Sequence, residues 1–184
     1  MKALLIIDMQ QDFVSPDGAA CVAGALPSVP TLALALQQAR LNGVPVIHIQ
    51  RHHKADGSDS EPFRRHAPVC IEQTWGAEPI AELAPTEGET IVVKTRFSAF
   101  YRTELDSVLS ELDCRELVVC GTQWPNCIRG TVMDALYRDH QVTVLTDACS
   151  GQSDAVAQAN QEDLHNMGVI CQTTEQWVAQ LAER

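Results

Sequence analysis

The sequence predicts an α/β fold, a doubly wound three-layer α/β/α sandwich around a six-stranded parallel sheet (Rossmann-like). Short apolar runs rich in β-branched residues alternate with longer segments of helical period along the whole chain. The apolar runs lack polar alternation, which is typical of strands covered on both faces. A length of 184 residues fits one domain with a substantial core, so we expect residues 1–184 to form a single domain.

Six apolar runs are expected to form the strands of this sheet. They are residues 3–7, 44–49, 90–93, 116–120, 142–145 and 168–171. Parallel neighbours need a crossover connection, usually a helix, and most of the intervening segments have a helical period. The runs therefore read as strands of successive βα units.

Apolar residues spaced for one helix face predict two of the helices. The first carries Leu105, Val108, Leu109 and Leu112, and the second carries Ile128, Val132, Ala135 and Leu136. Further helices are expected at about residues 29–42, 154–167 and 174–183, the first two ended by glycine signals. The segment 51–89 shows no clear strand and is longer than a structural connection needs, so we expect it to shape or cover a pocket.

Charge and cysteine content narrow the class of protein. The net charge of −11 and the absence of a basic stripe argue against nucleic-acid and anionic-membrane partners. The first apolar run is too short for a secretory signal or a membrane span, which predicts a cytoplasmic location. The seven cysteines are odd in number and scattered without CxxC spacing, so we expect free thiols.

Three chemically active side chains fall where the chemistry of an open parallel sheet is expected, outside the carboxyl ends of the strands. Asp8 follows the first strand, Lys94 follows the third, and a short turn after the fourth delivers Cys127 to the start of a helix. Taken singly, each has an ordinary structural role available as a turn cap, a solvated lysine or a buried thiol. Their convergence on one sheet edge predicts a catalytic centre.

Cys127 is the candidate nucleophile among the cysteines. A thiol in the first turn of a helix lies near the positive end of the helix dipole, and a neighbouring ammonium would add to that effect. Both influences favour the reactive thiolate. We therefore expect Cys127 to be activated, with Asp8 and Lys94 as its partners.

Three segments give the chain a resemblance to a known family. They read LLIIDMQQDF at 4–13, VKTRFSAF at 93–100 and CGTQWPNCIRGTVMDA at 120–135. In this order they resemble the isochorismatase-like, or cysteine hydrolase, superfamily, and the resemblance covers essentially the whole chain. It implies the isochorismatase-like hydrolase fold and the same catalytic residues, Asp8, Lys94 and Cys127.

The resemblance also implies a reaction. The family has a non-proline cis peptide before its cysteine, here Thr122–Gln123, with the amides of Gln123 and Cys127 forming the oxyanion hole. Isochorismatases proper lack the nucleophilic cysteine, so this chain is expected to be an amidohydrolase that cleaves a C–N bond of a small amide, ureido or carbamoyl compound through a thioester. Homodimers or larger homo-oligomers are also implied.

No cofactor and no metal are predicted. Metal-dependent amidases of the family carry an Asp-x-His motif after the second strand, but the matching positions here are Gln50, Arg51 and His52. The missing carboxylate weakens a nicotinamidase assignment. His52, His53 and His66 remain open as metal ligands, although solvated or substrate-facing roles are more common for such histidines.

Several residues near the three reactive positions are candidates for the substrate pocket, with core packing or turn capping as the alternative for each. They are Gln10, Phe13, Trp75, Phe97, Phe100, Trp124 and Asn126. Other functions also stay open: a nicotinamidase-type or isochorismatase-type hydrolase, or a non-catalytic or thiol-redox protein. A nucleotide or flavin binder is disfavoured because neither GxGxxG after the first strand nor GxxxxGK[ST] occurs.

Overall fold

A central parallel sheet organises the protein in a computed structural model that describes residues 1–182. Its strands are β1 (Lys2–Ile7), β2 (Val46–Arg51), β3 (Thr90–Lys94), β4 (Glu116–Thr122), β5 (Gln141–Ser150) and β6 (Ile170–Gln172). They pair in the order β3-β2-β1-β4-β5-β6, and every pair is parallel. The predicted six-stranded parallel sheet is confirmed.

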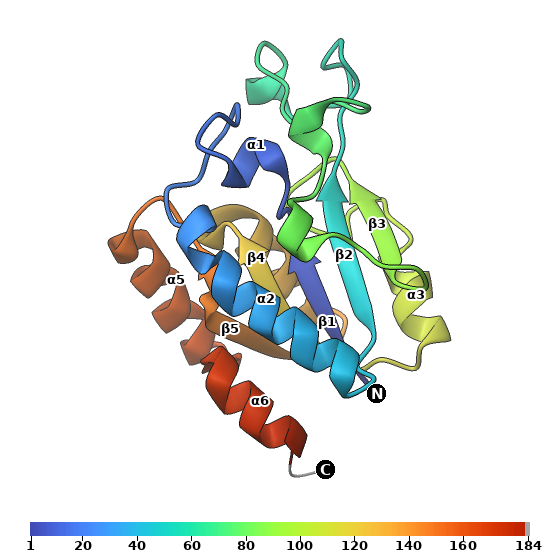
Figure 1. The fold of residues 1–184 in the computed structure, drawn as a ribbon, viewed down its shortest axis with the longest axis vertical. Helices are drawn as coiled ribbons and strands as arrows, with labels where there is room; N and C mark the ends of the chain where they lie inside the picture. Colours follow the sequence, from blue (N-terminus) through green and yellow to red (C-terminus); the bar gives the residue numbers. More distant parts are fainter. Residues whose placement is uncertain (183–184) are drawn as a thin grey trace.

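Helices cover the sheet on both sides. They are α1 (Gln11–Val14), α2 (Ala25–Leu41), α3 (Leu105–Glu111), α4 (Arg129–Leu136), α5 (Asp154–Asn166) and α6 (Thr174–Ala182). In Figure 1, α2 and α6 lie in front of the sheet and contact each other, whereas α4 lies behind it. This three-layer arrangement is the predicted one. None of the helices in residues 1–182 is long and apolar enough to cross a membrane.

Several element boundaries differ from those expected. Helix α2 begins at Ala25 instead of 29, and it contains Pro30. Strand β2 runs on to Arg51, and β5 is longer than predicted, ending at Ser150. The short helix α1 carried no sequence signal, since it is too brief to show a period. Residue 183 of the last predicted helix lies outside the described residues.

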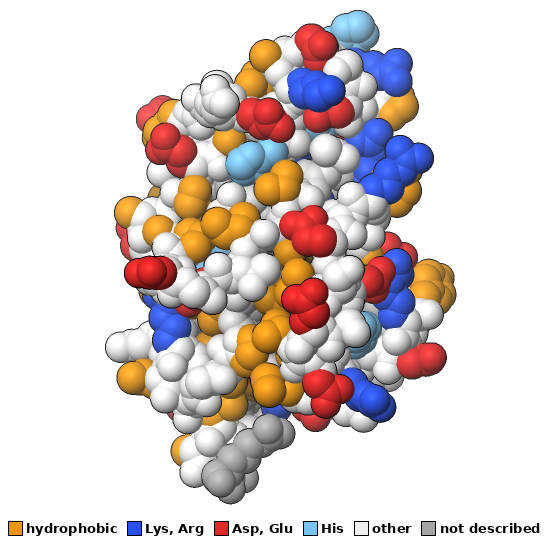
Figure 2. Space-filling model, turned by 90° about the vertical axis from the view of Figure 1, so that its right-hand side faces the viewer, with side chains coloured by type: hydrophobic (Ala, Val, Ile, Leu, Met, Phe, Trp, Pro, Cys, Tyr) orange, Lys and Arg blue, Asp and Glu red, His pale blue; other side chains and the backbone are white. Residues whose placement is uncertain are grey.

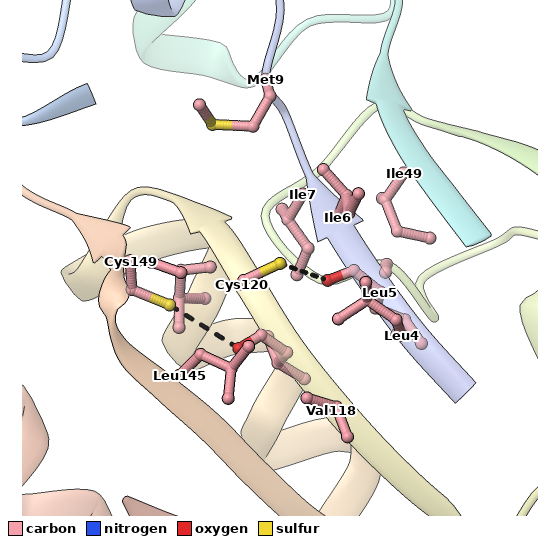
Figure 3. Packing of buried hydrophobic residues seen from close by; sticks show 14 of the residues in the cluster. Leu4, Leu5, Ile6, Ile7, Met9, Ile49, Val118, Cys120, Leu145 and Cys149 are labelled. Carbon is pink, nitrogen blue, oxygen red and sulfur yellow. Dashed lines mark hydrogen bonds between the residues drawn. The ribbon is translucent and has the colours of Figure 1, made fainter. Parts of the chain in front are cut away.

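The core joins the apolar side chains of the central strands to those of the helices. Figure 3 shows the part of it that lies on the strands. Two cysteines behave there as small core residues. The Cys120 thiol lies 3.5 Å from the carbonyl oxygen of Leu5, and the Cys149 thiol lies 3.8 Å from that of Val119. All seven cysteines are free, as predicted.

The strand order leaves an opening at the carboxyl edge of the sheet, between β1 and β4. The chain leaves β1 toward β2 on one side and leaves β4 toward β5 on the other, so the connections diverge between the neighbouring strands β1 and β4. Gly121 keeps these strands close: its φ is 121°, and a Cβ there would lie 2.1 Å from the carbonyl oxygen of Ile7. The turn after β4 therefore lies beside the residue that follows β1, Asp8.

The connection between β2 and β3 lies beyond the carboxyl ends of these strands, in the upper part of Figure 1. It contains three short 3-10 turns, Pro62–Arg64, Trp75–Ala77 and Ala81–Leu83, and a bridge between His53 and Ile71. Apart from Arg51 at its first position, the segment 51–89 forms no regular strand, as expected. It lies over the carboxyl edge of the sheet, where Asp8 follows β1 and Lys94 ends β3.

A partly exposed ionic cluster lies at the end of this connection, where β3 begins. Glu89 accepts hydrogen bonds from Arg40 of α2 at 2.7 and 2.9 Å, from the Thr86 amide at 2.9 Å, and lies 2.9 Å from Nε2 of His48 on β2. Burial acts to raise the pKa of Glu89, but the bonds from Arg40, Thr86 and His48 outweigh it and lower the pKa to about 2.

Glu89→Gln is expected to lower the free energy of unfolding by about 1–3 kcal/mol at neutral pH, because it removes charge-assisted bonds from Arg40 and His48. The folded-state pKa of Glu89 lies below its ordinary value, so its stabilisation is present above about pH 4.5 and is lost as the pH falls toward 2. Urea unfolding at about pH 7 and pH 3 should show the difference shrinking at the lower pH. Glu87→Gln, an exposed neighbour, is the control and should change little at either pH.

Candidate active site

An ion pair joins the ends of β1 and β3. The Lys94 ammonium lies 2.7 Å from Oδ2 of Asp8, and both side chains are almost completely buried. Lys94 also donates to the carbonyl oxygen of Arg96 at 3.0 Å. Asp8 has a positive φ of 53°, and its Oδ1 is buried without a hydrogen-bond partner among the described residues. This oxygen is therefore available to a proton donor in the pocket.

Cys127 lies in a turn between β4 and α4. The turn, Trp124–Ile128, is π-helical, and α4 begins only at Arg129. Burial raises the pKa of Cys127 to about 11, the charge of Asp8 adds to this, and the charges of Lys94 and Arg51 oppose it. The expected resting thiolate is therefore wrong: Cys127 is a thiol at neutral pH, because burial and Asp8 outweigh the two cations.

A buried arginine at the end of β2, beyond the predicted end of that strand, reaches the thiol. Arg51 ends β2 beside Lys94 in the sheet register, and its Nη2 lies 3.5 Å from Sγ of Cys127. Its Nη1 donates to Glu61 at 2.6 Å. Burial acts to lower the pKa of Arg51, but the Cys127 thiolate, which forms at a lower pH than Arg51 loses its proton, outweighs it together with the charges of Asp8 and Glu61 and raises that pKa. Arg51 thus places a fixed positive charge against the sulfur.

Asp8, Arg51 and Cys127 line one small pocket. Five residues that line it were predicted to belong to the site: Asp8, Phe13, Phe97, Asn126 and Cys127. Gln123, expected to supply an oxyanion amide, lines the pocket too, and the Thr122–Gln123 peptide is cis, as the family resemblance implied. The pocket is small beside typical ligand sites. Val22, Arg51, Arg64 and Thr122 complete the lining and were not predicted.

Four predicted pocket residues do not line this cavity. Gln10 is fully buried and binds backbone groups of Arg51 and Ala77 at 2.7–2.8 Å, so it positions the end of β2. Trp124 is buried and donates to the carbonyl oxygen of Cys149 at 3.2 Å. Phe100 belongs to the core, and Trp75 is 48% exposed on a 3-10 turn. Proximity in sequence to Asp8, Lys94 and Cys127 did not indicate the side-chain direction.

The three candidate metal histidines have different environments. His52 lies 3.2 Å from Oε1 of Gln50, and His53 is fully buried, 3.4 Å from Asp59 and 3.9 Å from Glu61. His66 is exposed. In residues 1–182 no three His, Cys, Asp or Glu side chains group closely enough to share an ion. With an amide at Gln50 and the Arg51 cation at the end of β2, the donor set at the family's Asp-x-His position does not fit a metal.

The fold and the pocket together define the class: a doubly wound α/β protein with a thiol, a carboxylate and two cations gathered at its topological switch point. The sequence of residues 2–176 matches the protein-family model described as the Isochorismatase domain. The chain therefore belongs to the isochorismatase family, within the isochorismatase-like hydrolase superfamily.

Relatives span the whole chain. A crystal structure of an isochorismatase family protein from Desulfovibrio vulgaris is 48% identical, with 98% of each chain covered and a TM-score of 0.95. An Arabidopsis thaliana protein described as a probable inactive nicotinamidase is 41% identical over 98% of this chain and 96% of its own. N-carbamoylsarcosine amidase from Thermoplasma acidophilum is 26% identical, covering 94% and 96%, with a TM-score of 0.82.

Proposed function

We propose that the protein is a cysteine amidase that cleaves the C–N bond of a small amide, ureido or carbamoyl compound. The observation that carries this proposal is the pocket itself, in which the Cys127 thiol and the Asp8 carboxylate face the same space. The Lys94 ammonium lies directly behind Asp8. This arrangement supplies a nucleophile, a base and a fixed positive charge within one small cavity.

In the first half-reaction Asp8 takes the proton of Cys127 while the sulfur attacks the substrate carbonyl carbon. The free Oδ1 of Asp8 is the acceptor, and Arg51 stabilises the developing thiolate. The carbonyl oxygen becomes an oxyanion that the backbone amides of Gln123 and Cys127 bind. Asp8 then returns the proton to the leaving nitrogen, the C–N bond breaks, and ammonia or an amine departs.

In the second half-reaction the same carboxylate acts on water. Asp8 removes a proton as the water oxygen attacks the thioester, and the proton passes back to the sulfur when the C–S bond breaks. Lys94 pairs with Asp8 and balances its charge. The raised pKa of Cys127 fits the role of Asp8 as a base, because a resting thiol must lose its proton as the sulfur attacks.

Two other functions are weaker. A nicotinamidase with a metal-held substrate is disfavoured by the donor set at Gln50 and Arg51, and an isochorismatase proper by the presence of Cys127. A thiol-redox role lacks support, because the cysteines are all free and Cys127 is a protonated thiol rather than an oxidisable thiolate. The expected homo-oligomeric state stays a prediction.

Ammonia release from a panel of small amides, ureas and carbamoyl compounds tests the proposal. Nicotinamide belongs in the panel because of the plant relative. We expect at least one ureido or carbamoyl compound to be hydrolysed with saturation, and Cys127→Ala to serve as the blank. A panel in which no compound exceeds that blank would contradict an amidase.

A further inference from the structure

A second arginine lines the pocket and has no role in the proposed chemistry. Arg64, in the connection between β2 and β3, faces the same cavity as Cys127. It is half-buried, and its Nε is buried without a hydrogen-bond partner in the part of the chain that the structure describes. A desolvated guanidinium nitrogen without an acceptor costs free energy, which an anionic ligand would recover.

Three charged residues line the pocket, Asp8, Arg51 and Arg64, and the first two have ion-pair partners. Asp8 pairs with Lys94 at 2.7 Å, and Arg51 pairs with Glu61 at 2.6 Å. Arg64 has no ion pair within residues 1–182. Among the residues that line the pocket, Arg64 is thus a positive charge without a carboxylate partner, although the whole chain carries −11. Figure 2 shows Lys and Arg side chains gathered near the upper end of one face, toward the connection between β2 and β3.

Aromatic rings hold the two arginines in place. The guanidinium carbon of Arg64 lies 5.5 Å from the ring centre of Phe63, and Phe63 lies 6.3 Å from Phe97. Phe97 in turn lies 5.3 Å from the guanidinium carbon of Arg51. Each guanidinium therefore lies near an aromatic ring, and the two rings lie near each other. This row of side chains extends from the thiol to the connection between β2 and β3 and contains Arg51, Phe97, Phe63 and Arg64.

We propose that the substrate carries a carboxylate, bound by Arg64 while the scissile carbonyl lies at Cys127. A guanidinium matches the planar carboxylate in geometry, and one carboxylate balances one free positive charge. The remaining wall at Phe13, Val22 and Phe97 is apolar and fits a short carbon chain between the two groups. The inference rests on the proposed function for the identity of the scissile bond, but the anion site can be tested without turnover.

Alkylation of Cys127 measures the anion preference directly. Iodoacetate and iodoacetamide both lose iodide to an attacking thiolate and form a thioether, and they differ in charge. Their rate ratio at one cysteine does not depend on its pKa, because both react with the same thiolate. The rates are measured at about pH 9 by peptide mass spectrometry, with half-buried Cys21 in the same sample as the reference.

We expect the iodoacetate-to-iodoacetamide ratio at Cys127 to exceed that at Cys21 by about ten-fold. Arg64→Gln should remove this excess, whereas Arg65→Gln, its exposed neighbour, should keep it. A ratio at Cys127 no greater than at Cys21, or one unchanged in Arg64→Gln, would overturn the carboxylate site. A preserved ratio in a protein that hydrolyses no amide would instead overturn only the proposed function.

Matched substrates extend the test to turnover. N-carbamoyl-β-alanine and its carboxamide differ only in the charge of the group distant from the ureido carbon. We expect Arg64→Gln to raise KM about ten-fold for the acid with little change in kcat, and to leave the carboxamide unaffected. Equal losses for both compounds would mean that Arg64 only shapes the pocket.

Discussion

Cys127→Ala is expected to abolish hydrolysis while the fold persists. The sulfur is the only group in the proposed cycle that bonds to the substrate, so kcat should fall on the order of 10⁴-fold or more. The side chain is small, and its loss removes little packing next to an existing cavity. Ammonia release and thermal unfolding of the same preparation would measure both quantities.

Cys120→Ala is the matched control for this prediction. Cys120 lies on β4 just before the same turn, but its sulfur faces the carbonyl oxygen of Leu5 in the core. This variant should lose some stability and keep its turnover per folded molecule. Residual hydrolysis near the parent rate in Cys127→Ala would show that the thiol is not the nucleophile.

Asp8→Asn should lower kcat by about 10³-fold, because a carboxamide cannot accept the thiol proton. Burial, the largest cause of the raised pKa of Cys127, persists in the variant, so few thiolates form at neutral pH without the base. The loss should therefore diminish as the assay pH rises, since solvent then removes the proton instead. A pH profile of kcat for the variant and the parent would show this convergence.

The same change also disturbs folding, which must be measured separately. Lys94 is buried and would lose its counter-charge, so we expect destabilisation of about 3–5 kcal/mol. Asp12→Asn provides a comparison, because Asp12 is another buried carboxylate near β1, bound to the amides of Ala19 and Cys70. It should destabilise the fold and leave the pH profile unchanged. Turnover within a few-fold of the parent in folded Asp8→Asn would make Asp8 structural only.

Much of the fold and part of the site could be predicted from the sequence. Strands buried on both faces are continuous apolar runs, and their carboxyl ends meet at one edge of the sheet. This rule predicted that Asp8 and Lys94 lie close together, and the structure shows them in contact. The same rule could have found Arg51, had the second strand been extended to its last residue. The polar end of that strand, Gln50 and Arg51, hid its true boundary.

Other site residues had no local signal. Arg64 lies in a connection without regular period, and only the folded chain brings it to the cavity of Cys127. The direction of an aromatic ring depends on packing, so Trp124 faces Cys149 although it adjoins the reactive turn. The raised pKa of Cys127 depends on burial, which the position of a thiol near a helix does not reveal.

In the proposed reaction, the catalytic groups and the arginine that selects the substrate come from different parts of the architecture. Asp8, Arg51 and Lys94 sit at the ends of the neighbouring strands β1, β2 and β3, where small shifts would disturb the sheet. Arg64 sits on the long connection between β2 and β3, which contains no strand of the sheet. Insertions and exchanges there could redirect such a scaffold toward new compounds over evolutionary time, while the bond-breaking apparatus is inherited intact.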